Sequence, residues 1–202
     1  CPAYSRVATS GSGVDKEGTA VGQANIFVIG LDETNLDTLR HLPNLADYQI
    51  HPLLDKEELQ DGATIPVADL LAKAQKTLDD FDGSIDAVVG YWDFPVSTIV
   101  PILCARYGLS GPSLESVVKC EHKYWSRLEQ RRVIDELPAF ALVDLDGDPR
   151  PPEGLRFPMW LKPVKSFSSE LAFHVADEKE FRAAVTEIRE GISRVGEPFD
   201  SI

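Results

Sequence analysis

Between residues 25 and 112 the chain alternates short apolar runs with amphipathic segments, and no other feature constrains its fold as strongly. Asn25–Leu31 and Ile85–Tyr91 are continuous apolar runs, typical of parallel strands covered on both faces. Tyr48–Leu54 is a third strand candidate. Helices are predicted over 32–42, 65–81 and 95–107, the second from apolar residues at three- to four-residue steps. Strand and helix in alternation predict an α/β fold with a doubly wound parallel sheet.

Ligands of such sheets usually lie beyond the carboxyl ends of the strands. Two polar segments, Gly30–Glu33 and Gly90–Asp93, follow predicted strands at this edge. The candidate substrate-side residues are therefore Gly30, Asp32, Glu33, Tyr91 and Asp93. The first strand lacks the GxGxxG pattern, which argues against a dinucleotide cofactor.

The pattern changes at Ser113, where a second, smaller domain of α+β type is expected. A long helical stretch over 114–137, with a break expected near Cys120, precedes three strand candidates and a helix over 178–192. The strand candidates are 139–143, 157–164 and 171–175. Residues 1–24 are rich in Gly, Ser and Thr and are predicted to form a flexible leader. The domains expected are thus 1–24, 25–112 and 113–202, and the chain is expected to be a segment of a longer protein.

The charge distribution narrows the class of ligand. A net charge of −13 over 202 residues argues against nucleic acid or an anionic membrane as partner. Residues 119–166, however, hold 9 basic and 8 acidic side chains, which favours a small anionic ligand. Three cysteines without CxxC spacing indicate reduced thiols and a cytoplasmic location rather than a disulfide scaffold or zinc ribbon.

Basic side chains in this middle segment are the candidates for anion binding. Lys119, Lys123, Arg127 and Arg131 recur every four residues and would share one face of an unbroken helix. Acidic neighbours and solvent explain such a stripe as well as an anion does. Lys162 interrupts the apolar segment 157–164, where either an anion meets its ammonium or the side chain reaches solvent from an edge strand.

A serine-rich loop follows that strand directly. Ser166, Ser168 and Ser169 can offer hydroxyl and backbone N–H groups to a phosphate, or can form an ordinary polar hairpin. The acidic run Asp144–Asp148 departs from the calcium-loop pattern, and a tight Asp-Gly turn explains it better.

In this order, the segments resemble the front half of ATP-grasp enzymes, the superfamily of biotin carboxylase, D-alanine–D-alanine ligase and amino-acid ligases. The resemblance covers residues 25–202 and rests on these motifs: Leu109–Ser113, His122-Lys123 with Arg127, the Leu137–Phe140 entry to a strand, the strand 157–164, the serine loop, and 171–181. It implies that 25–112 is a pre-ATP-grasp domain and 113–202 the first ATP-grasp subdomain. It further implies that Lys123, Lys162 and the loop of Ser166, Ser168 and Ser169 contact the ATP phosphates.

The function implied is that of an ATP-dependent carboxylate–amine ligase that forms an acyl phosphate. ATP and Mg²⁺ are the implied cofactors, with the magnesium ligands expected beyond Ile202, so that this segment alone would be inactive. The implied partners are ATP and a small carboxylate, without nucleic acid or membrane, and a homodimer is compatible with the resemblance. The alternative is a non-catalytic, flavodoxin-like binding or regulatory module.

Overall fold

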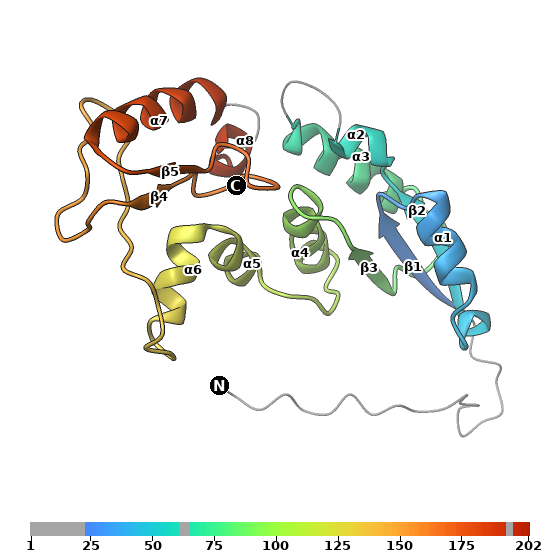
Figure 1. Cartoon of the computed structure of the whole chain (residues 1–202). Helices are drawn as coiled ribbons and strands as arrows, with labels where there is room; N and C mark the ends of the chain where they lie inside the picture. The colour runs from blue at the N-terminus through green and yellow to red at the C-terminus, as the bar shows by residue number, and fades with distance from the viewer. Residues whose placement is uncertain (1–22, 61–64, 193–195) are drawn as a thin grey trace.

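The structure, a computed structural model, describes residues 23–60, 65–192 and 196–202 (Figure 1). The predicted leader over 1–24 lies outside the described residues except for its last two positions, and Ala24 already belongs to the first strand. None of the helices in the described ranges is long and apolar enough to cross a lipid bilayer.

The predicted parallel sheet is present. Strands β1 (Ala24–Ile29), β2 (Tyr48–Leu53) and β3 (Ala87–Gly90) form a three-stranded sheet in the order β2-β1-β3. Both pairings are parallel, with Ile26 opposite Ile50 on one side and opposite Ala87 on the other. The apolar run predicted as a buried strand is the central strand, and its last three residues are buried.

Four α-helices accompany this sheet: α1 (Glu33–Arg40), α2 (Lys56–Gln60), α3 (Val67–Asp79) and α4 (Val96–Arg106), with a short 3-10 turn, η1 (Leu45–Asp47), before β2. Helix α3 buries Val67, Leu70, Ala74 and Leu78, the three- to four-residue spacing that predicted it. These side chains share one core with Phe27, Ile29, Leu53, Val88 and Ile99. The fold class is therefore α/β, as expected.

The second half contains α5 (Leu114–Glu121), α6 (Lys123–Gln130), β4 (Met159–Leu161), β5 (Phe173–Val175), α7 (Glu178–Gly191) and α8 (Gly196–Asp200). Strands β4 and β5 pair antiparallel. Helix α7 packs Phe181, Ala184, Val185 and Ile188 against them in a second core. Figure 1 shows α4 between β3 and the α5–α6 pair, so this helix connects the two halves.

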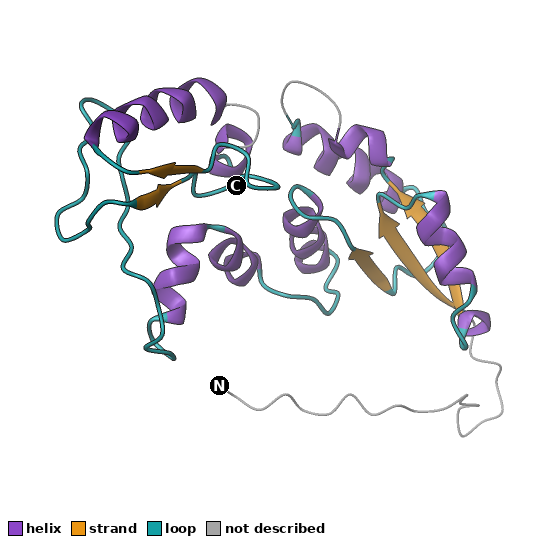
Figure 2. Cartoon of the chain, viewed as in Figure 1, coloured by secondary structure: helices purple, strands orange, loops and turns teal. Residues whose placement is uncertain are grey.

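Three sequence predictions in this half are wrong in detail. The long helix over 114–137 is broken at His122 and ends at Gln130. No strand forms over 139–143; this segment is part of a long loop (Figure 2), and Leu142 is 55% exposed. The strand predicted over 157–164 is reduced to Met159–Leu161. Apolar composition favours a strand, but a strand also needs a neighbouring backbone to complete its hydrogen bonds. Among the described residues of this half, β5 provides that backbone for Met159–Leu161 alone.

Candidate anion-binding site

Lys123 lies where α6, the end of β4 and the serine loop meet. It is the first residue of α6, and its backbone N–H donates to the carbonyl of Val164 at 2.9 Å. Its Nζ donates to both the carbonyl oxygen and Oγ of Ser166, each at 3.3 Å. Lys123 and Ser166, both predicted from the sequence to contact ATP phosphates, are therefore in direct contact with each other.

The Lys123 ammonium is half-buried and forms no ion pair with any carboxylate among the described residues. Burial is the main cause that lowers its pKa below the ordinary lysine value of 10.5, and the positive charges of Lys165 and Lys162 lower it further. Asp93 acts weakly in the opposite direction. A cation held beside two other cations in a partly dry place lacks a counter-charge, and an anion would supply it.

Of the two positions that the sequence left open for Lys162, the structure shows the solvent-exposed one. Lys162 follows the last residue of β4 and is exposed, so it bears none of the desolvation cost expected for a half-buried strand lysine. The strand alternation explains this: Trp160, 64% exposed, and Lys162 point outward, whereas Leu161 and Pro163 are buried. Lys162 nevertheless contributes positive charge at Lys123.

The buried lysine of this segment is Lys165, which the sequence reasoning did not select. Only 4% of Lys165 is exposed, and its Nζ lies 2.7 Å from Asp93 Oδ1 and 3.1 Å from Glu121 Oε2. Three aromatic rings, those of Phe94, Phe167 and Phe199, surround the ammonium at 5.4–5.9 Å. The signal in the sequence was the two-residue period, which places position 165 on the inward face with 161 and 163.

The contacts of Lys165 make it a structural cation and not a free one. Asp93, which comes from the carboxyl end of β3, is joined through it to α5 and to the serine loop. Glu121 Oε2 is buried and lacks a well-aligned hydrogen bond within the described ranges, although it lies within ion-pair distance of Lys165. Its charge is therefore stabilised mainly by the electrostatic attraction of Lys165.

The serine loop adopts an unusual backbone. Ser168 and Ser169 have φ values of 42° and 63°, and Leu171 follows at 56°. Such left-handed conformations cost side-chain-bearing residues on the order of 1 kcal/mol each. Backbone hydrogen bonds from Glu170 to Phe167 and from Ala172 to Ser169 hold the turn, and the side chains of Ser168 and Ser169 are exposed. Neither serine is hydrogen-bonded to Lys123. Of the three predicted serines in the described loop, only Ser166 therefore joins Lys123, Lys162 and Lys165 in what we call the lysine cluster.

The predicted basic stripe is divided by the break at His122. The His122 ring nitrogen Nδ1 accepts the N–H of Trp125 at 3.2 Å and so caps α6, and the ring stacks on Trp125 at 4.1 Å. Lys119 pairs with Glu115 and Glu129 at 2.6 and 3.4 Å.

Beyond the break, Arg127 donates to Gln130 at 2.9 Å, and the Arg131 guanidinium lies 5.2 Å from the Phe140 ring. Of the four basic residues, only Lys123 is turned into the cluster; the others have local partners.

The predicted substrate-side residues do gather at the carboxyl ends of β1 and β3. The Tyr91 hydroxyl donates to the carbonyl of Gly30 at 2.7 Å and accepts the N–H of Asp32 at 3.2 Å. Gly30 has φ +68°, and a Cβ there would lie 2.7 Å from Leu59, which explains the glycine.

The carboxylates of this group are already engaged. Asp32 caps α1 through the N–H of Asn35 at 2.8 Å and pairs with Lys56 at 3.1 Å; that capping bond is the main cause that lowers its pKa. Asp93 is bound to Lys165, and Glu33 is exposed in the first turn of α1. Asp93 is thus the member of the predicted group that reaches the lysine cluster.

No group of three or more metal-ligating side chains occurs among the residues that the structure describes, so the described part assigns no ligands to the magnesium ion expected from the sequence.

Comparisons of the chain with protein-family models, with curated proteins and with solved structures find no match.

Proposed function

We propose that the chain binds the phosphate groups of ATP and is part of an ATP-dependent ligase that activates a carboxylate. The observation that carries this proposal is the half-buried Lys123 side chain, which contacts Ser166 and has no carboxylate within ion-pair distance among the described residues, while the charges of Lys165 and Lys162 lower its pKa. A polyphosphate has the charge and the oxygen atoms that such a group of cations would stabilise.

Each lysine has a different part in this proposal. Lys123 would donate to a phosphate oxygen in place of, or in addition to, its contacts with Ser166. Lys162, which is exposed to solvent, would reach an outer phosphate oxygen. Lys165 would act indirectly, by holding Asp93 and the serine loop in place, because its ammonium is enclosed by Asp93, Glu121 and aromatic rings. The residues 25–112 and 113–202 would then correspond to a pre-ATP-grasp domain and the first ATP-grasp subdomain, in a doubly wound arrangement.

The reaction proposed is phosphoryl transfer followed by acyl transfer. A carboxylate oxygen of the acceptor attacks the γ-phosphorus; the new O–P bond forms as the bond to the β-phosphate oxygen breaks, and ADP leaves. An amine then attacks the acyl carbon, loses a proton and releases inorganic phosphate. The contribution of Lys123 and Lys162 is electrostatic, because they hold the phosphates and offset charge that develops on the oxygens during transfer.

The proposed location is the cytoplasm. A homodimer is compatible with the proposed function. The acceptor carboxylate would approach from the carboxyl ends of β1 and β3, where Asp93 connects the sheet to Lys165. Mg²⁺, when bound, would neutralise phosphate charge; its ligands are not assigned here to described residues.

The test is ADP release by the full chain and by any longer protein that contains it, measured in a coupled assay with ATP, Mg²⁺ and a panel of carboxylate–amine pairs. ADP release that requires both a carboxylate and an amine supports a ligase. Saturable ATP binding without substrate-dependent ADP release would instead support the binding or regulatory module. If neither the full chain nor the longer protein binds ATP, the proposal is rejected.

A further inference from the structure

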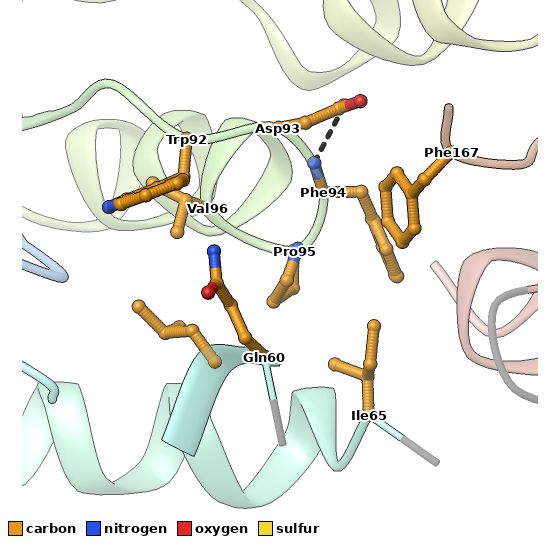
Figure 3. A pocket seen from close by; sticks show the side chains of 9 residues that line it. Gln60, Ile65, Trp92, Asp93, Phe94, Pro95, Val96 and Phe167 are labelled. Carbon is orange, nitrogen blue, oxygen red and sulfur yellow. Dashed lines mark hydrogen bonds between the residues drawn. The ribbon is translucent and has the colours of Figure 1, made fainter. Parts of the chain in front are cut away.

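A cavity of about 230 Å³ lies beside the lysine cluster, between the carboxyl end of β3 and the end of α2 (Figure 3). Its walls are mainly apolar: Trp92, Phe94 and Phe167 supply aromatic surface, and Leu59 and Ile65 supply aliphatic surface. The polar Nε1 of Trp92 is already occupied, because it donates to the carbonyl of Gly30 at 3.0 Å. The cavity therefore offers mostly apolar contact to whatever enters it.

The size of the cavity limits its contents. An apolar protein cavity of roughly 150 Å³ is large enough to bind benzene. A volume of about 230 Å³ accordingly admits one six-membered ring with a few further atoms, and any larger part of a ligand would extend through the open side of the cavity. The two phenylalanine rings lie at one end of the space in Figure 3, and the Gln60 side chain extends towards Trp92 and Pro95 from the opposite wall.

Two residues belong both to the cavity and to the lysine cluster. Asp93 lines the cavity and binds Lys165 at 2.7 Å. Phe167 lines it too, lies under the Lys165 ammonium at 5.4 Å, and follows Ser166, the residue that contacts Lys123. Lys165 is shared by Asp93 and Glu121, so its own charge is balanced. The positive charge that an anionic group would meet at this end of the cavity comes from Lys123, which interacts electrostatically with Asp93, and from Lys162.

We infer that the cavity receives an aromatic or compact branched apolar group of a small carboxylate, whose anionic end points to the lysine cluster. This inference rests on the proposed function for its role, since the carboxylate would be the group that ATP activates. It adds the chemical class of the acceptor: an arylalkanoic or branched-chain acid and not a small polar acid such as glycine or aspartate.

The test uses 4-fluorophenylacetate as probe, with fluoroacetate as the probe that lacks the ring, and follows both by ¹⁹F NMR titration of the full chain without nucleotide. The inference expects saturable binding of the ring-bearing probe and, in ¹H–¹³C spectra recorded during the same titration, shifts of the Ile65 methyl signals. Gln60→Trp, which places a large ring at an exposed rim position, should weaken that binding by roughly fivefold or more. Glu57→Trp, on the exposed side of the same helix, is the matched control and should leave it unchanged.

The inference is overturned if the two probes behave alike, if Ile65 does not respond, or if the two tryptophan variants bind the probe equally. ATP binding is measured separately on the same samples. A chain that binds ATP but not 4-fluorophenylacetate would refute the cavity assignment alone. A chain that binds the probe at Ile65 but not ATP would refute the proposed function and would leave a pocket for an apolar acid.

Discussion

Replacing Lys123 with Met should separate the two consequences of its unusual position. The substitution keeps an unbranched side chain of similar length and removes the charge. The ammonium is half-buried, and its pKa is lowered by burial and by two neighbouring lysines, so its charge opposes folding. Its contacts with Ser166 are both 3.3 Å long, which makes them weak compensation. The free energy of unfolding of Lys123→Met should therefore be equal to that of the wild type or higher.

ATP affinity should change in the opposite direction. A hydrogen bond to a charged partner contributes about 1.5–3 kcal/mol. Losing one between Lys123 and a phosphate corresponds to an increase in Kd of roughly 10- to 150-fold. Titration calorimetry of the full chain with ATP measures this change, and thermal unfolding of the same samples measures stability.

Lys119→Met is the matched control from the preceding helix. Lys119 is paired with Glu115 and Glu129 near the protein surface, so its loss should lower stability only slightly. Its loss should also leave the Kd for ATP within about twofold of the wild type, since it has its own counter-charges. Our reasoning is refuted if Lys123→Met binds ATP as the wild type does, or if it unfolds at a clearly lower temperature than Lys119→Met. Either result would identify Lys123 as a structural cation.

Three further outcomes are expected. First, because the pKa of Lys123 is below 10.5, ATP affinity should decline with rising pH earlier than the titration of an ordinary lysine would predict, and calorimetry in a pH series with Lys123→Met as reference would reveal it. Second, Lys165→Met leaves Glu121 as a buried, uncompensated charge and should lower stability by roughly 3–5 kcal/mol. The double variant that also carries Glu121→Gln should recover part of this loss. Equal stabilities of the single and double variants would contradict this account. Third, burial lowers the pKa of His122 below 6.5, so the folded state binds the His122 proton less readily than the unfolded state does. Urea titrations should therefore show that stability falls as pH drops below about 6.5. The fall should be less steep in His122→Asn, which keeps a helix cap without a titrating ring.

Much of the site was accessible from residue type and spacing, but the arrangement of the lysines was not. Lys123 lies near the serine loop, and Asp93 follows the carboxyl end of β3, as the spacing of the segments predicted. For Lys162 the apolar neighbourhood left two positions open, one facing an anion within the segment and one reaching solvent, and the structure shows it exposed directly after a three-residue strand. The helix break at His122 was expected two residues early, and it removed the stripe on which Lys119 and Arg131 were candidates.

The sequence by itself determined the α/β class, the central apolar strand and the helices α3 and α7, because the spacing of apolar residues within a segment is set by the period of its own backbone. Only the tertiary structure decided which lysine is neutralised and which lacks a counter-charge. The partner of Lys165 is Asp93, 72 positions earlier in the chain, and no local pattern encodes such a pairing. Electrostatic energies depend on distance and burial in three dimensions, so they are settled when the sheet edge, the helix break and the serine loop come together.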